Sequence, residues 1–146
     1  MSVDNTELWS NEAVQIPLEI RKFGIRVGRI TDPRLVTEAT WVLVVKTQGF
    51  ATTLRDSFDS MVKIAPVEHI REVSLAAGEP GISLRKLSVA PRAIPYYQNS
   101  AYFELDRNGP YWAKLCQSGG VALLLNDDLV ALDIECWAIP VGTHTG

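Results

Sequence analysis

Residues 94–120 read IPYYQNSAYFELDRNGPYWAKLCQSGG, and the rest of the chain is organised around them. This stretch holds all four tyrosines of the protein. Its pattern predicts an aromatic corner stiffened by proline at residues 94–97, then a strand from residue 100, then a short helix near residue 110. Aromatic side chains bury large areas, so we expect much of the core to gather around this stretch. Nothing in it is typical of a catalytic site.

The predicted strand separates two faces by strict alternation. One face carries Ala101, Phe103 and Leu105, and the other carries Tyr102, Glu104 and Asp106. A period of two is that of a half-buried strand. We therefore expect a strand whose two faces differ in character.

The predicted helix has both a start signal and a stop signal. Pro110 is tolerated in the first helical turn, where its missing N–H costs nothing, and Gly119 with Gly120 is typical of a helix end. Cys116 lies on the apolar side of this helix. A nucleophilic thiol needs a base beside it, so an inert, buried Cys116 is favoured.

Upstream of the corner, residues 41–46 form an apolar run without alternation, which predicts a central strand covered on both faces. Residues 23–27 alternate and predict a half-buried strand. Two helices are expected, one carrying the apolar stripe of residues 54–61 and one opened by Pro66 and ended by Gly78. Four apolar side chains of the segment before the corner are expected to face inward: Ile82, Leu84, Leu87 and Val89.

Downstream of the helix, residues 121–125 and 129–137 read as two strands. Asn126-Asp127-Asp128 joins them, so the sequence predicts an antiparallel hairpin. The paired aspartates lack the glycine and glutamate framework of a calcium loop, and turn chemistry explains them without a ligand.

The chain has 146 residues, of which 47% are hydrophobic and 21% charged. This is the size and composition of one ordinary globular domain. We expect the α+β class, a mixed or mostly antiparallel sheet flanked by about three short helices. Residues 14–140 would form the single domain, with a flexible leader at 1–13 and a flexible tail at 141–146.

A net charge of -3 gives no general attraction to nucleic acid, and a base-stacking platform is poorly supported. No apolar run approaches the ~20 residues that cross a bilayer, and residues 1–11 do not resemble a secretory signal. The two cysteines, Cys116 and Cys136, have no paired spacing. These observations predict a cytoplasmic protein with reduced thiols, without membrane insertion or a nucleic-acid partner.

The strongest enzymatic candidate is the pair His69 and Glu72. Three residues apart on a helix, they could share a metal ion or a proton. A zinc site needs at least three well-placed ligands, and the only other histidine is His144. A solvated, charged helix side is therefore favoured, and we expect no metal and no cofactor.

Tyr96, Tyr97 and Tyr102 leave two interpretations open. Tyrosine is a good anchor at protein interfaces, so the three could form an exposed binding patch. They could equally close the domain's own core.

Several segments together resemble a known family, TssK, the baseplate subunit of bacterial type VI secretion. In chain order they are 17–19 (PLE), 24–28 (GIRVG), 62–72 (VKIAPVEHIRE), 80–85 (PGISLR), 89–96 (VAPRAIPY), 102–106 (YFELD), 118–120 (SGG) and 132–139 (LDIECWAI). Each piece is weak alone, but the ordered set is fairly specific. It runs from about residue 14 to residue 139 and resembles the C-terminal head of TssK.

The resemblance implies a structural role and no enzymatic activity. TssK-like proteins have an N-terminal β-sandwich that grips other baseplate subunits, a helical neck that forms trimers, and a head that docks on the cytoplasmic parts of TssL and TssM. This chain matches the head alone, so the resemblance does not say whether it is a monomer. The alternative is a small cytoplasmic enzyme or metal-binding protein centred on His69 and Glu72.

Within the predicted head, the corner is our leading candidate for part of the docking surface. The candidate partner-binding residues are Ile94, Pro95, Tyr96, Tyr97 and Tyr102.

Overall fold

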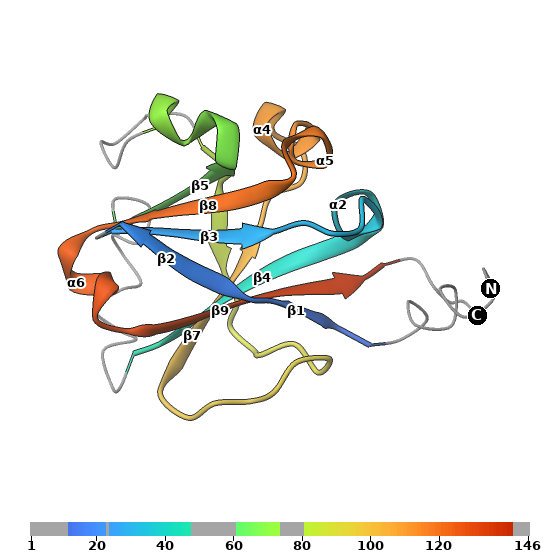
Figure 1. The fold of residues 1–146 in the computed structure, drawn as a ribbon. Coiled ribbons are helices and arrows are strands. Elements are labelled where there is room, and N and C mark those ends of the chain that lie inside the picture. The colour runs from blue at the N-terminus through green and yellow to red at the C-terminus, as the bar shows by residue number, and fades with distance from the viewer. Residues whose placement is uncertain (1–11, 23, 48–60, 74–80, 142–146) are drawn as a thin grey trace.

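The computed structural model of the protein describes residues 12–22, 24–47, 61–73 and 81–141. Strands of these residues form two antiparallel sheets (Figure 1). The five-stranded sheet contains, in spatial order, β1 (Val14–Ile16), β9 (Asp133–Pro140), β4 (Ala39–Lys46), β7 (Ser100–Leu105) and β6 (Leu84–Lys86). The four-stranded sheet contains β2 (Leu18–Lys22), β3 (Ile25–Arg29), β8 (Gly120–Leu125) and β5 (Val62–Pro66).

The helices of the described residues are all short. They are α2 (Arg34–Thr37), the 3₁₀ helix η2 (Val67–Glu72), α4 (Pro110–Ala113), α5 (Leu115–Ser118) and α6 (Asp127–Val130). The expected α+β class, with antiparallel strands and short helices in a single small domain, is confirmed. None of the helices in the part of the chain that the structure describes is long and apolar enough to span a membrane.

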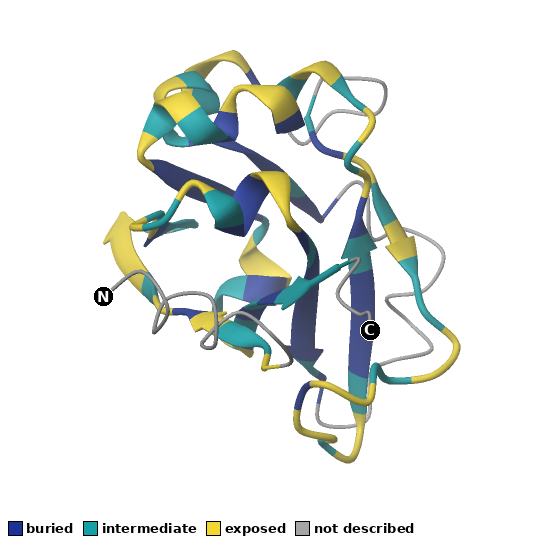
Figure 2. Cartoon of the chain, turned by 90° about the vertical axis from the view of Figure 1, so that its right-hand side faces the viewer, coloured by how far each residue is buried: buried dark blue, intermediate teal, exposed yellow. Residues whose placement is uncertain are grey.

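The main hydrophobic core lies between the two sheets. Its buried side chains come from both, for example Leu43 on β4, Phe103 on β7 and Leu123 on β8. Figure 2 shows the burial concentrated in the central strands and the exposure in the connections at the ends. This distribution is the expected one for two amphipathic sheets that bury one face against each other.

The strand β4 is central and buried on both faces, as its unbroken apolar run predicted. Trp41 and Leu43 point into the main core, whereas Val42 and Val44 belong to a second cluster on the outer face of the five-stranded sheet. Tyr102, which the sequence left open between the domain's own core and a binding patch, is buried. It is only 4% exposed, because the chain before β7 folds back over this outer face and covers it.

The start and stop of the predicted helix at residues 110–118 are confirmed, but it is divided into α4 and α5 at Lys114. Gly119 ends α5 with a φ of 78°, a left-handed conformation that glycine adopts without steric cost. On α4, Trp112 meets Trp41 edge to face at 5.6 Å between ring centroids, and its indole N–H donates to the carbonyl of Val36 at 3.2 Å.

The predicted hairpin of residues 121–125 and 129–137 is wrong. Its two strands, β8 and β9, belong to different sheets, and each is already paired on both edges. Between them Asn126 caps α6, since its side-chain oxygen accepts hydrogen bonds from the backbone N–H groups of Asp128 and Leu129. Leu129 is fully buried and anchors this helix in the core. The connection therefore carries the chain from one sheet to the other.

Two further predictions concern the segment before the corner. The helix opened by Pro66 exists as the 3₁₀ helix η2, and its expected continuation through residues 74–78 lies outside the described residues. The apolar stripe of residues 54–61 lies outside them too, except for Met61. The predicted leader and tail also fall almost wholly outside the described part of the chain, so their flexibility stays a prediction.

Candidate docking surface

The corner at residues 94–97 lies between β6 and β7 and packs on the outer face of the five-stranded sheet. The structure divides its candidate residues by burial. Ile94 is 5% exposed and joins Tyr102, Val42 and Val44 in the second hydrophobic cluster. Tyr96, in contrast, is 75% exposed. Tyr102 thus closes the domain's own core, whereas the exposed Tyr96 stays a candidate for a binding patch.

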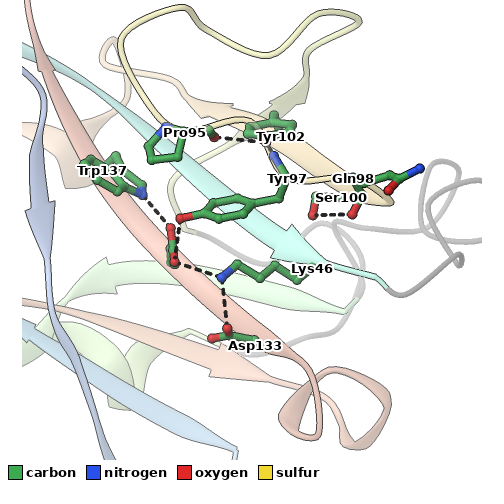
Figure 3. Close-up of polar contacts among 9 residues, drawn as sticks. Lys46, Pro95, Tyr97, Gln98, Ser100, Tyr102, Asp133 and Trp137 are labelled. Atoms are coloured by element: carbon green, nitrogen blue, oxygen red, sulfur yellow. Dashed lines mark hydrogen bonds and ion pairs between the residues drawn. The ribbon is translucent and has the colours of Figure 1, made fainter.

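The buried Tyr102 hydroxyl fixes the backbone of the corner. It accepts a hydrogen bond from the N–H of Tyr97 at 2.8 Å and donates one to the carbonyl of Pro95 at 3.3 Å (Figure 3). A single side chain of β7 therefore satisfies two backbone groups that regular strand pairing leaves free. Buried hydrogen bonds of this kind stabilise by about 1 kcal/mol each and favour one loop conformation.

Tyr97 anchors the other side of the corner through a polar network on β4 and β9. Its hydroxyl donates to Glu135 Oε2 at 3.1 Å, and its ring lies 3.9 Å from Lys46 Nζ (Figure 3). Lys46 forms ion pairs with Glu135 at 3.0 Å and Asp133 at 3.1 Å. The indole N–H of Trp137 donates to the second oxygen of Glu135 at 2.8 Å.

This network changes the titration of two of its members. The hydrogen bond to Glu135 is the main cause that raises the pKa of Lys46. Burial is the main cause that raises the pKa of Tyr97, and its hydrogen bond to Glu135 adds to the effect. Both groups therefore hold their protons more tightly than in the unfolded chain.

The stem that leads from the corner into β7 is fixed as well. Asn99 has a φ of 59°, a left-handed conformation that asparagine tolerates better than most residues. Its carbonyl accepts two hydrogen bonds from Thr47, one from the backbone N–H at 3.0 Å and one from the hydroxyl at 2.6 Å. The corner is thus held at both ends.

The outward side of the corner is a depression of about 610 Å³. Val89 and Tyr96, which are 77% and 75% exposed, line it together with Pro91, Arg92 and the buried Ile94. We call the four residues Val89, Pro91, Arg92 and Tyr96 the corner surface. The prediction that Val89 faces inward is wrong, because the chain bends at residues 88–89 after it leaves β6.

Sequence reasoning did not find the supporting network or the contribution of Val89 and Arg92. Lys46 ends an apolar run, and Glu135 is one polar residue of an alternating strand. Neither pattern by itself predicts a functional role. The register of β4 against β9 brings them together, since it pairs Lys46 with Asp133 and Val44 with Glu135. No local pattern in the sequence encodes that register.

At the alternative site, His69 and Glu72 each contact Tyr111. The His69 ring meets the ring of Tyr111 edge to face at 5.8 Å, and the Tyr111 hydroxyl donates to Glu72 at 3.4 Å. The Nδ1 atom of His69 is buried and has no hydrogen-bond partner. Within the described ranges no three His, Cys, Asp or Glu side chains are placed to hold a metal ion.

The two thiols are both free. Cys136 is buried in the main core, and burial raises its pKa to about 12. The thiolate is the nucleophilic form, so Cys136 is inert near neutral pH. Cys116 is half-buried, contrary to the expectation of a fully buried thiol, and its sulfur lies 3.9 Å from the carbonyl of Pro33.

The fold defines the class of this protein. It is similar to a solved structure described as the TssK C-terminal domain from the E. coli type VI secretion system, with a TM-score of 0.72 and 24% identity over 88% of this chain and 99% of that chain. It is also similar to a crystal structure of TssK, with a TM-score of 0.80 and 37% identity over 89% of this chain and 29% of that chain. The architecture is therefore that of a TssK C-terminal domain.

Sequence comparison gives the family. Residues 6–139 match the T6SS_VasE family, described as bacterial type VI secretion, VC_A0110, EvfL, ImpJ, VasE. The chain belongs to this family. It is 40% identical over 129 residues to the type VI secretion system baseplate component TssK1 of Pseudomonas aeruginosa, over 88% of this chain and 29% of that protein. The chain thus spans about three-tenths of the length of TssK1 and of the chain in the TssK crystal structure.

Proposed function

We propose that this chain is a non-enzymatic adaptor domain of a bacterial type VI secretion system. In this role it acts in the cytoplasm and connects the baseplate to the cytoplasmic parts of TssL and TssM. The family and the similarity to TssK C-terminal domains support a structural role in secretion. Contacts with other baseplate subunits, and any trimer, would belong to regions of TssK that this chain does not match.

The observation that carries the proposal is the rigid, apolar corner surface. Large apolar side chains that remain exposed on a folded domain are candidates for protein contacts, and tyrosine is enriched among the residues that dominate binding energy. Val89 and Tyr96 are two such side chains in one depression. Tyr102 and Tyr97 hold the chain beneath them in one conformation, so binding loses little conformational entropy.

A pull-down tests both the adaptor role and the surface. The intact chain is incubated with the immobilised cytoplasmic domains of TssL and TssM from the same bacterium. We expect retention of the native chain and about tenfold or greater weakening by Tyr96→Ala, because truncation removes a central aromatic anchor. Tyr97→Phe, which keeps the ring but loses the bond to Glu135, should weaken binding less.

Ile20→Ala is the matched control. Ile20 is 73% exposed on β2 of the other sheet, so this variant removes an equally exposed apolar side chain away from the corner. It should bind like the native chain. If the native chain is well folded but is not retained, the adaptor role is refuted. Equal retention of the Tyr96→Ala and native chains would show that the corner only packs against its own domain.

A further inference from the structure

The segment that forms the corner has a charge opposite to that of the whole protein. Residues 80–103 contain Arg85, Lys86 and Arg92 and no aspartate or glutamate, although the chain as a whole carries a net charge of -3. The first acid after the segment, Glu104, forms an ion pair with Arg85 across β6 and β7. The corner therefore presents excess positive charge on an acidic protein.

Arg92 is the charged residue among those that line the depression of the corner surface. Its side chain is exposed, and none of the carboxylates in the described part of the chain forms an ion pair with it. The acids that contact the supporting network of the corner, Asp133 and Glu135, are engaged by Lys46, and Glu135 also accepts hydrogen bonds from Tyr97 and Trp137. The guanidinium is thus left available next to two exposed apolar side chains.

We propose that the corner surface binds an extended segment of a partner protein in which a carboxylate lies beside an apolar or aromatic side chain. The carboxylate pairs with Arg92, whose planar guanidinium can donate two parallel hydrogen bonds to it. The neighbouring apolar side chain packs on Val89 and Tyr96. This inference rests on the proposed function and specifies the chemistry of the segment that docks.

Charge complementarity is the reason to choose an acidic segment. A basic segment would place like charges together at Arg92, which costs free energy at an interface. A nucleic acid would need a row of cations along its phosphates, and the depression offers a single guanidinium. The apolar residues that line the depression are Val89, Pro91 and Tyr96. They favour an apolar side chain beside the carboxylate, because contact with them removes apolar surface from water.

Synthetic peptides test this chemistry without TssL or TssM. The intact, ¹⁵N-labelled chain is titrated with acetyl-Asp-Glu-Leu-Trp-Glu-Asp-amide, with a basic counterpart in which Lys and Arg replace the acids, and with an acidic counterpart in which Ser-Ser replaces Leu-Trp. We expect the first peptide to shift backbone amide signals of residues 88–96. The other two should bind more weakly, the basic one by roughly two- to fivefold at low salt, the range of a partly exposed ion pair.

Charge reversal gives the sharper result. Arg92→Glu should reverse the order of the peptide affinities, so that the basic peptide binds more tightly than the first, acidic peptide. Tyr96→Ala should weaken both by about tenfold, since the apolar anchor is shared. Arg29→Glu is the control, because Arg29 is exposed at the end of β3 in the other sheet and the variant makes the same change in net charge. It should keep the native order.

The outcomes separate this inference from the proposed function. The inference is overturned if the first peptide shifts no signals of residues 88–96, if the basic peptide binds the native chain as well as the acidic one, or if Arg92→Glu leaves the order unchanged. Peptide binding with the expected order, but no retention by TssL or TssM, would refute only the adaptor role. If TssL and TssM retain the Arg92→Glu chain as well as the native chain, only the proposal of an acidic segment is refuted.

Discussion

Glu135 is the residue on which the support of the corner converges. One of its oxygens accepts from the Tyr97 hydroxyl and pairs with Lys46, and the other accepts from the Trp137 indole. A half-buried carboxylate is costly to desolvate unless its oxygens are paired, and here both are. Removing Glu135 would therefore leave the Tyr97 hydroxyl and the Trp137 indole N–H without this acceptor, and Lys46 with Asp133 alone.

This network predicts how stability depends on alkaline pH. The folded state raises the pKa of Lys46 above its ordinary 10.5 and that of Tyr97 above its ordinary 10.0. A raised pKa contributes stability that is fully present below the unfolded value and is lost as pH rises through the folded value. We therefore expect the free energy of unfolding, measured by urea denaturation, to fall as pH rises above about 10.

Glu135→Gln should flatten this fall, because it removes the main cause of the raised Lys46 pKa. Glu68→Gln is a suitable control, since Glu68 is exposed on η2 away from the network. It should retain the native slope. Equal slopes for Glu135→Gln and the native chain would contradict the role given to the network.

At the scale of elements, a glycine is important for stability where another segment lies too close to leave room for a Cβ atom. Gly28 lies on β3 and faces the point at which residues 16–18 pass from β1 to β2. A Cβ there would lie 2.8 Å from Ile16 Cγ2 and 3.3 Å from the carbonyl of Pro17. Gly109 precedes α4, and a Cβ there would meet no atom of the described residues within 4 Å.

Gly28→Ala should therefore lower the free energy of unfolding by about 1–3 kcal/mol, the usual cost of overpacking. Gly109→Ala should change it by about 0.5 kcal/mol or less, because the poorer N-cap is offset by the lower conformational entropy of the unfolded chain. Urea denaturation with an unchanged dependence on denaturant measures both. A similar loss in the two variants would mean that β1 and β2 move apart readily, and that their contact with β3 contributes little.

At the scale of the whole molecule, the two ends of the described fold pair with each other. β1 runs antiparallel to β9, with Val14 opposite Ala138 and Ile16 opposite Cys136. Ile16 is 2% exposed and joins the main core. This pairing supports our proposal that residues 14–140 suffice for the domain.

A chain shortened to residues 14–140 should keep the native free energy of unfolding within about 1 kcal/mol. Among the described residues, it loses the hydrogen bond from Val141 to Glu38 and the packing of the small Ala13 side chain on the second cluster. A chain shortened to residues 18–140 lacks β1 and Ile16, and should lose at least about 1.5–3 kcal/mol. Circular dichroism and urea denaturation measure the two. Failure of the 14–140 chain to fold would show that the domain boundaries are wrong.

The local features of this protein were readable from its sequence. The strand at β7, the start of α4 at Pro110, the stop at Gly119 and the doubly buried β4 each follow from a short pattern of apolar residues, proline and glycine. Neighbouring residues alone determine such patterns through side-chain period and backbone sterics. The ordered family segments were readable for the same reason, since they need no knowledge of spatial contacts.

Partner choice between strands was decided only by the tertiary structure. Residues 121–125 and 129–137 were predicted to form a hairpin, yet β8 pairs with β3 and β5 while β9 pairs with β1 and β4. The same holds for the candidate surface. Tyr102 is buried and Tyr96 exposed because the chain folds back over β4, and Lys46 meets Glu135 because of a register set by two whole strands. Burial and pairing depend on which distant segments compete for the same face, and no local period carries that information.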